Sequence, residues 1–272
     1  MIGKFLKLLV LLSLLIIMPY VITIHLHEEI KPREIVTSEE DQKLEEYCLQ
    51  VLSKEVSSDY EDEMLKVQAI LVRTTIYKEV QENGADAMQN LDETIDLLWL
   101  QRLKKVWNQT EGKVIMYEDK LALTPFHQIS SGKTRNGEDV LGSKEYPYLQ
   151  SKECQMDISA PEQIENILIP AKEMEIKEWD TAGYVMKVSV DGEEMSGEEF
   201  REMYGLASSC FEFQQFENDA RIITKGVGHG LGLSQYTANE MAKDGKTFEE
   251  ILQFFFPGTE IKEVAEILWK VE

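Results

Sequence analysis

Glu55 is the side chain whose position in the sequence most suggests acid–base chemistry. It continues the apolar face of a predicted helix, whose other members are Leu44, Cys48, Val51 and Leu52. A carboxyl group on such a face loses solvent and lies near a helix C-terminus, and both effects disfavour its ionised form. The neutral form is the one that a general acid needs near neutral pH. An exposed carboxylate at a frayed helix end is the competing interpretation.

Lys66 and Arg73 are two cations on one side of a predicted helix, because seven residues make two helical turns. In a chain with a net charge of -22, such a pair could bind an anionic ligand. The two side chains could equally pair with local acids such as Glu63 and Glu79. Spacing alone leaves both interpretations open.

The segment from Phe126 to Thr134 is polar and contains Gly132-Lys133-Thr134, which is similar to the end of a phosphate-binding loop. The complete loop pattern requires glycine at position 127, which is His127 here. This mismatch excludes a nucleotide site of that type.

Glycine occupies every second position from Gly226 to Gly232, which makes this the most distinctive run of the sequence. In an extended segment these glycines would leave one face without side chains, so that a ligand could approach closely. A dinucleotide-binding fingerprint would need glycine at 231 or 233, and both are leucine. His229 within the run is either a core histidine or a functional one. A serine or cysteine hydrolase built on His229 lacks the nucleophile motif G-x-S-x-G.

The elements that must position these residues follow from hydrophobic periodicity. Apolar spacing predicts helices over about residues 44–55, 61–80 and 92–107. The core stripe of the second helix should consist of Leu65, Ala69, Val72 and Ile76. The chain is expected to return to helix after Ser234, where Thr247 and Glu250 predict a capping box and Pro257-Gly258 a helix end.

Between the helices the sequence favours strands, with β-like runs at Val114–Tyr117, Tyr184–Val190 and Phe211–Phe216. Asp191-Gly192 is typical of a hairpin turn. Helices, then strands, then helices predict an α+β fold. We expect the N- and C-terminal parts to form a helical core around a strand-rich insertion at about 112–224.

Composition and hydropathy limit the binding partners and the cellular location that can be expected. The 272 residues carry 28 basic and 50 acidic side chains, so we expect no nucleic-acid partner. Residues 8–24 are almost all hydrophobic and follow Lys4 and Lys7, which predicts a single-pass membrane anchor within residues 1–27. A cleaved signal peptide is the alternative. We expect residues 28–43 to be a linker and residues 44–272 to be one extracytoplasmic domain.

The three cysteines, Cys48, Cys154 and Cys210, form no C-x-x-C pattern. A disulfide between Cys154 and Cys210 is possible in an extracytoplasmic domain, and the sequence leaves this open.

Several stretches together resemble the signatures of the stage II sporulation protein D family. Glu55–Ser58, Glu63–Ala69 and Arg73-Thr74 are similar to its E-M-P…E-A-L-K-A-Q-A…A-R-T-Y signature. Gly228–Tyr236 is similar to its G-H-G-x-G-M-S-Q-Y-G motif, and Ser131–Thr134 also fits, as do residues 242–245 and 254–258. The resemblance covers about residues 44–260.

This resemblance implies a peptidoglycan lytic transglycosylase that cuts the β-1,4 bond after N-acetylmuramic acid in glycan strands stripped of stem peptides. It implies a role in engulfment during sporulation, with a cell-wall amidase and a membrane scaffold protein as partners. By position, Glu55 would be the sole catalytic acid/base, and no cofactor is implied. The glycan groove would be lined by Lys66, Arg73, His127, Ser131, Gly132, Lys133, Thr134, His229, Gly230, Ser234, Gln235 and Tyr236.

The chain departs from the family signature in three places. Val56-Ser57 replaces Met-Pro after the catalytic position, Thr75 replaces tyrosine, and Thr237 replaces glycine. Some relatives hold zinc through His and Cys, but His127 has no nearby cysteine in this sequence, so we expect no metal. The substitutions beside Glu55 keep a second class of function open, a non-catalytic glycan-binding or scaffold protein of the cell envelope.

Overall fold

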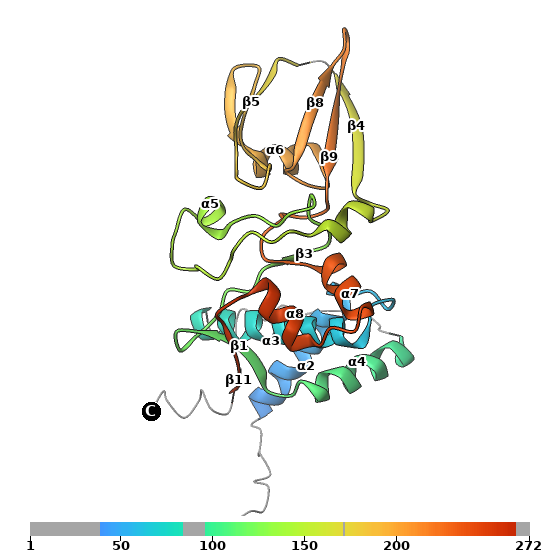
Figure 1. The fold of residues 1–272 in the computed structure, drawn as a ribbon, viewed down its shortest axis with the longest axis vertical. Coiled ribbons are helices and arrows are strands. Elements are labelled where there is room, and N and C mark those ends of the chain that lie inside the picture. The colour runs from blue at the N-terminus through green and yellow to red at the C-terminus, as the bar shows by residue number, and fades with distance from the viewer. Residues whose placement is uncertain (1–38, 84–95, 171, 265–272) are drawn as a thin grey trace, which may run out of the picture. The chain divides into compact units, whose positions relative to one another are not determined.

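Helices and small separate sheets coexist in the computed structural model, which describes residues 39–83, 96–170 and 172–264 (Figure 1). The helices are α2 (Glu39–Glu55), α3 (Asp62–Asn83), α4 (Leu97–Gln109), α5 (Gly137–Leu141), the 3-10 helix η2 (Gln155–Ser159), α6 (Gly197–Tyr204), α7 (Gln235–Lys243) and α8 (Phe248–Phe255). The strands follow in chain order as β1 (Lys113–Tyr117), β2 (Lys120–Leu121), β3 (Phe126–His127), β4 (Ile164–Pro170), β5 (Met174–Trp179), β6 (Val185–Val190), β7 (Glu193–Ser196), β8 (Phe211–Gln215), β9 (Asp219–Lys225), β10 (Leu233–Ser234) and β11 (Glu260–Glu263). The predicted α+β class is confirmed.

Helix α3 is buried on two faces, which makes it the centre of the helical part. One face carries the predicted stripe, and it packs in a core with apolar residues of α2 and α4 such as Leu52 and Leu103. The other face carries Ile70 and Leu71, which pack in a second core with residues of α7 and α8 such as Phe255. Helices from both ends of the described chain therefore enclose α3, because neither of its faces can be left in water.

The β1 strand belongs with this helical part. It pairs antiparallel with the C-terminal strand β11 and with β2. Ile115 in β1 is fully buried in the same core as Ile70 and Phe255. The Ile115 amide also donates a hydrogen bond to the Thr74 hydroxyl of α3 at 2.9 Å.

The strand-rich part has its own core. Two antiparallel sheets, β4-β9-β8 and β5-β6-β7, contribute to one cluster that also contains Phe200 of α6. Helix α6 begins with a capping box formed by Ser196 and Glu199. The predicted hairpin turn joins β6 and β7, and both Asp191 and Gly192 adopt positive φ there.

The capping box of Thr247 and Glu250 at the start of α8 is confirmed.

The predicted anchor and most of the predicted linker lie outside the described residues. Among the described helices, none combines the length and the apolar character that crossing a bilayer requires. Cys48, Cys154 and Cys210 are all buried free thiols, so Cys154 and Cys210 form no disulfide.

Arg73 is the most unusual core residue of α3, because its charged side chain is fully buried. Its Nε lies 3.3 Å from a carboxylate oxygen of Glu45, and its Nη1 donates to the carbonyls of Thr110 at 2.8 Å and Lys113 at 3.2 Å. The guanidinium also stacks 3.7 Å from the ring centroid of Trp107. Arg73 thereby joins α2, α3, α4 and the start of β1.

Replacing Arg73 with methionine should lower the free energy of unfolding by about 3 kcal/mol, because Glu45 and two carbonyls would lose their donor. Denaturant titration of Arg73→Met measures this loss. Lys78→Met is the matched control on α3, since Lys78 forms only a partly exposed pair with Glu82 at 2.8 Å. That pair is worth about 0.3–0.5 kcal/mol. Equal losses in the two variants would contradict the structural role of Arg73.

Candidate active site

Glu55 is the last residue of α2, and its side chain is exposed to solvent. The inward positions at this end of the helix belong to Leu52 and Val56, which are 0% and 8% exposed. The prediction that Glu55 lies on the buried face is therefore wrong, because that face continues to Val56 where the helix ends. The exposed position instead leaves the carboxyl group accessible to a large ligand.

The backbone of Glu55 is tied to helix α7. Gln235 is the first residue of α7 and is only 3% exposed. Its side-chain nitrogen donates to the Glu55 carbonyl at 3.1 Å, and its side-chain oxygen lies 3.5 Å from the Tyr60 hydroxyl. Gln235 thereby links the end of α2 to the loop that follows it and to α7.

The loop after Glu55 is also held from α4. Arg102 donates to the carbonyls of Ser58 at 2.6 Å and Tyr60 at 2.5 Å, and its Nε donates to the Asp62 carboxylate at 3.0 Å. Three bonds from one planar guanidinium fix the loop between α2 and α3. The sequence gives no local signal for this role, because Arg102 lies far along the chain from the carbonyls that it binds.

The short parallel pair of β3 and β10 brings two of the predicted motifs together. Its register places His127 opposite Ser234. Next to it, the Tyr236 amide donates to the Gln128 carbonyl at 3.0 Å. Ser234 caps α7, since its hydroxyl accepts from the Thr237 amide. The pair therefore sets where α7 begins, and with it the positions of Gln235 and Tyr236.

The glycine-rich run leading into β10 is not extended, so the bare face that an extended segment would have is absent. Its four glycines, from Gly226 to Gly232, all have φ between 76° and 104°. Positive φ at alternate residues makes the backbone wind, and glycine adopts it without strain. At Gly232 a side chain is also excluded by space, because a Cβ there would lie 2.0 Å from the Pro125 carbonyl oxygen. The glycines thus serve backbone geometry and close packing.

His127 lies under this run with its ring almost completely buried, at 4% exposure. Its Nδ1 lies 3.1 Å from the Leu231 carbonyl, which can only accept, so this nitrogen carries the proton. Its Nε2 is buried and has no hydrogen-bond partner among the described residues. Burial is the main cause that lowers the pKa of His127 to about 3, and the neighbouring His229 acts in the same direction.

His229 is partly buried, and its ring centroid lies 5.7 Å from that of His127. Its Nδ1 accepts from the Leu231 amide at 3.1 Å, which places the proton of the neutral ring on Nε2. Burial lowers the pKa of His229, and the charge of Glu198 opposes this shift. Both histidines are therefore neutral groups near pH 7, one with an unpaired acceptor nitrogen.

The segment Ser131–Thr134 follows β3, and most of its polar groups bind other parts of the protein. The Ser131 amide donates to the Tyr184 hydroxyl at 3.0 Å, and Gly132 has a φ of 107°. Thr134 is fully buried, and its hydroxyl accepts from the Lys152 amide at 2.8 Å. Lys133 is partly exposed, and its ammonium donates to the Thr181 carbonyl at 3.3 Å. Of these four residues, Lys133 is the one that presents a charge.

Asp157 is a site-forming residue that the sequence analysis missed. Its carboxylate is fully buried and accepts from the Ser130 amide at 2.7 Å, the Ser234 hydroxyl at 2.9 Å and the Thr237 hydroxyl at 2.6 Å. Asp157 therefore joins η2, the loop after β3 and the start of α7. It also gives a role to Thr237, one of the departures from the family signature.

The two cations predicted for the groove lie in different surroundings. Lys66 pairs with Glu63 at 2.5 Å and lies 5.9 Å from the Phe248 ring, with 18% of its side chain exposed. Pairing with a local acid was the open alternative for this residue. Arg73 has no exposed surface, and Trp107 and Glu45 enclose it. The structure therefore does not place Arg73 in a groove with the residues around β3 and β10.

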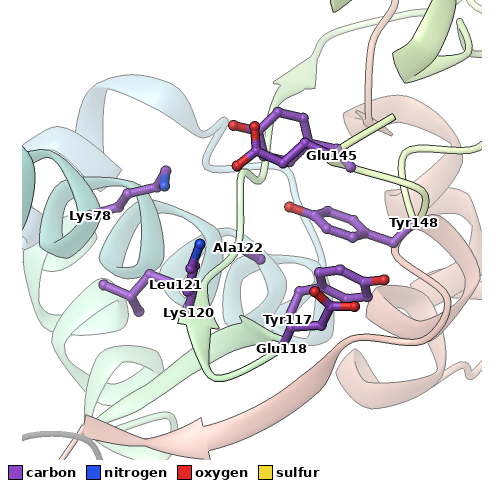
Figure 2. A pocket seen from close by; sticks show the side chains of 9 residues that line it. Lys78, Tyr117, Glu118, Lys120, Leu121, Ala122, Glu145 and Tyr148 are labelled. Carbon is purple, nitrogen blue, oxygen red and sulfur yellow. The ribbon is translucent and has the colours of Figure 1, made fainter. Parts of the chain in front are cut away.

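A separate hollow lies beside the turn between β1 and β2 (Figure 2). The rings of Tyr117 and Tyr148 pack against each other in its wall, with centroids 4.8 Å apart. None of the predicted site residues lines this hollow, whose walls are formed by Lys78, Tyr117, Glu118, Lys120, Leu121, Ala122, Glu145, Tyr146 and Tyr148.

Metal ligands do not gather at the candidate site. Across residues 39–83, 96–170 and 172–264, no group of three or more His, Cys, Asp or Glu side chains is arranged to hold a metal ion. The two histidines lack a third protein ligand there, whereas a zinc site takes three or four.

The low pKa of His127 predicts acid sensitivity. Between pH 3 and about 6.5 the unfolded chain binds a proton at this ring that the folded protein does not, so stability is lost as pH falls below about 6.5. One such group contributes up to about 1.4 kcal/mol per pH unit. His127→Asn keeps a donor toward Leu231 and removes the titration. Denaturation at pH 5.5 and pH 4 should show a shallower loss for the variant, and equal losses would contradict the assignment.

Comparison with known proteins identifies the family of this chain. A family model described as stage II sporulation protein matches residues 33–117. Stage II sporulation protein D of Bacillus amyloliquefaciens is 31% identical over 269 residues, covering 86% of this chain and 78% of that protein. The same protein of Bacillus subtilis (strain 168) is 30% identical with the same coverage, and a Bacillus subtilis protein named amidase enhancer is 22% identical, covering 77% of this chain and 39% of that protein. The chain belongs to the stage II sporulation protein D family.

Proposed function

We propose that the protein is a peptidoglycan lytic transglycosylase that cuts the β-1,4 bond between N-acetylmuramic acid and N-acetylglucosamine, with Glu55 as its single acid/base. The observation that carries the proposal is that Glu55 has a solvent-exposed side chain, a backbone carbonyl bound by Gln235 of α7, and a following loop held by Arg102 of α4. A catalytic group must be accessible to a polymer and attached to a well-held backbone; the Glu55 side chain is accessible, and its backbone carbonyl is bound. Membership of the family supports the same choice.

A single carboxyl group suffices for this reaction. The Glu55 acid protonates the glycosidic oxygen as the bond to the anomeric carbon breaks. The resulting carboxylate then takes the proton of the muramoyl 6-hydroxyl, whose oxygen attacks the same anomeric carbon and closes a 1,6-anhydro ring. A hydrolase needs a second carboxylate, whereas here the nucleophile belongs to the substrate and benefits from its proximity.

The substrate class follows from the charge of the proposed groove. Glycan strands without stem peptides expose the lactyl carboxylates of their muramic acids. Lys133 and Lys66 are partly exposed cations on two motifs of the site, in a chain of net charge -22. They are the side chains proposed to bind these carboxylates, whereas His229, Ser234, Gln235 and Tyr236 would shape the groove near Glu55. The other proposed groove positions are His127, Ser131, Gly132, Thr134 and Gly230.

The cellular context of the proposal is the cell envelope during sporulation. The relatives of highest identity reported above are named stage II sporulation protein D, and a more distant one is named amidase enhancer. A cell-wall amidase that strips stem peptides would supply the substrate, and a membrane scaffold protein of engulfment is a further proposed partner. The N-terminal hydrophobic segment would anchor the chain with its catalytic domain outside the cytoplasm.

Glu55→Gln should lower kcat by about 10²–10⁴-fold, because it removes the proton that is transferred while nearly preserving shape. Mass spectrometry of stripped glycan strands after digestion would count the 1,6-anhydro ends. Glu46→Gln is the matched control, since Glu46 is another exposed carboxylate on α2.

Three outcomes of this assay separate the candidate functions. Anhydro ends that disappear in Glu55→Gln support the lytic enzyme. Reducing ends would indicate a hydrolase, and binding without cleavage by the unmodified protein would indicate the non-catalytic scaffold. An active Glu55→Gln variant would remove Glu55 from the chemistry.

Lys133→Gln should weaken binding of stripped, anionic glycan by about two- to fivefold while binding of a neutral chitin oligomer changes less. The difference should shrink as salt rises, because the contact is partly exposed. Lys144→Gln is the control in the same region, with a side chain 84% exposed and paired with Glu138. Equal weakening on both ligands would show that Lys133 acts on structure rather than on charge.

A further inference from the structure

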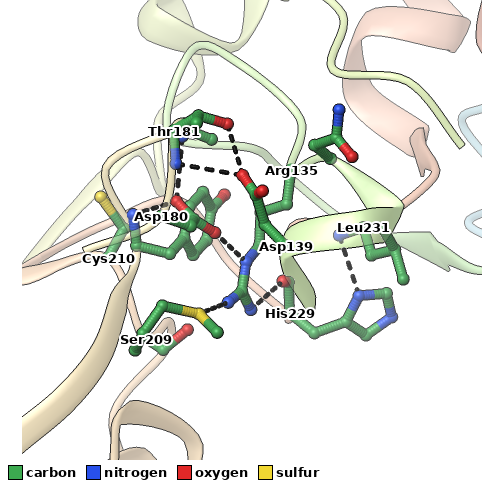
Figure 3. Close-up of polar contacts among 12 residues, drawn as sticks. Arg135, Asp139, Asp180, Thr181, Ser209, Cys210, His229 and Leu231 are labelled. Carbon is green, nitrogen blue, oxygen red and sulfur yellow. Dashed lines mark hydrogen bonds and ion pairs between the residues drawn. The ribbon is translucent and has the colours of Figure 1, made fainter. Parts of the chain in front are cut away.

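Arg135 is a buried arginine that the proposed mechanism does not use. It is 3% exposed, yet each of its side-chain nitrogens has an acceptor (Figure 3). Nε donates to the Asp180 carboxylate at 2.6 Å, and Nη2 points to the Met186 sulfur at 3.0 Å. Nη1 donates to the Glu198 carboxylate at 3.0 Å and to the His229 carbonyl at 3.2 Å. One guanidinium thus contacts both the strand-rich part and the glycine-rich run.

Arg135 contacts the glycine-rich run twice, once through its backbone and once through its side chain. The Arg135 backbone amide donates to the Gly230 carbonyl at 2.8 Å, next to the carbonyl of His229 that the side chain binds. Two consecutive carbonyls are therefore held by one residue. Because glycine leaves the run with many accessible backbone states, such bonds decide which of them is occupied.

Tyr184 closes the other side of the same run. The Arg135 guanidinium lies 4.9 Å from the Tyr184 ring centroid. A Cβ on Gly230 would lie 2.4 Å from the tip of that ring, so the tyrosine packs directly on the glycine. The Tyr184 hydroxyl accepts from the Ser131 amide. Two segments of the proposed site, Ser131–Arg135 and the glycine-rich run, therefore meet at this arginine and tyrosine.

Asp180 connects the arginine to the hairpin of β5 and β6. Its side chain is fully buried, and one carboxylate oxygen accepts from the amides of Ala182 and Tyr184, each at 2.9 Å. The other oxygen is the one that binds Arg135. The carboxylate thus shapes the turn that presents Tyr184 and neutralises the buried guanidinium.

We propose that Arg135 is a positioning residue, which uses the strand-rich part as a support to fix the backbone of His229 and Gly230 in the glycan groove. The effect that we expect on catalysis depends on the proposed glycan-cleaving function. The competing account is that the pair of Arg135 and Asp180 only stabilises the fold. The two accounts predict different KM values for a folded variant in which both charges are removed: KM rises if Arg135 positions the run and is unchanged if the pair only stabilises the fold.

The test is the double variant Arg135→Met/Asp180→Asn in the full-length chain. Replacing both members avoids leaving a lone buried charge, and asparagine keeps an acceptor for the Ala182 and Tyr184 amides. We expect the melting temperature to stay near that of the unmodified protein. We expect KM for stripped glycan to rise at least about fivefold, with kcat changed less than about twofold. Unchanged KM in a folded double variant would overturn the inference.

Arg135→Lys keeps the charge beside Asp180 but cannot span the carboxylates and the His229 carbonyl together. It should raise KM in the same direction, and it serves as the second variant if the double variant does not fold. Arg201→Gln is the control, because the Nη1 of Arg201 also binds Glu198, at 3.2 Å, but its Nε donates to the Leu206 carbonyl rather than to the glycine-rich run. Its KM should stay within about twofold of the unmodified value.

A readout independent of cleavage separates this inference from the proposed function. The Leu231 amide donates to the His229 ring and should exchange its hydrogen at least about tenfold faster in the double variant. If the unmodified protein neither binds nor cleaves glycan, the proposed function fails, while faster exchange confined to the run still supports positioning. Unchanged exchange at Leu231 would overturn it.

Discussion

The burial of α3 on two faces is the constraint on which the rest of the structure depends. A helix with apolar residues on both sides cannot be covered by one neighbour. Helices α2 and α4 cover one face, and α7 and α8, which come much later in the sequence, cover the other. The end of α2 and the start of α7 are linked directly by the bond between Gln235 and the Glu55 carbonyl. The candidate site forms along that link.

Local pattern predicted the elements well, because periodicity and caps depend on neighbours in sequence. The stripe of α3, the capping box of α8 and the turn at Asp191-Gly192 were all expected and are present. The surroundings of single side chains were harder to predict. Glu55 is exposed because the inward face passes to Val56, and periodicity does not tell at which residue a helix stops contributing to a core.

Long-range contacts account for the rest of what the sequence could not reveal. Arg73 resembles a surface cation by spacing, but Glu45 and Trp107 reach it from other helices. Asp157 carries no motif, and its role depends on three partners from two distant segments. Two of the family motifs nevertheless meet in the fold, since the pairing of β3 with β10 brings His127 to Ser234.

Arginine has a consistent role in this acidic protein. Arg73, Arg102 and Arg135 each bind backbone carbonyls together with a carboxylate. A planar fork of donors suits that task, because one side chain can satisfy several acceptors that face it from different segments. The arginines thus serve as internal ties between elements. In the proposed function, the partly exposed Lys66 and Lys133 supply the charges that bind an anionic polymer.

The three cysteines have a consequence for where the polypeptide can fold. All are buried free thiols, and burial raises the pKa of each of them, that of Cys154 to about 12, so these groups stay protonated and unreactive in the folded protein. The native state therefore contains no bond whose formation needs an oxidant. Because no disulfide forms, a change between a reducing and an oxidising environment would neither assemble nor dismantle the fold.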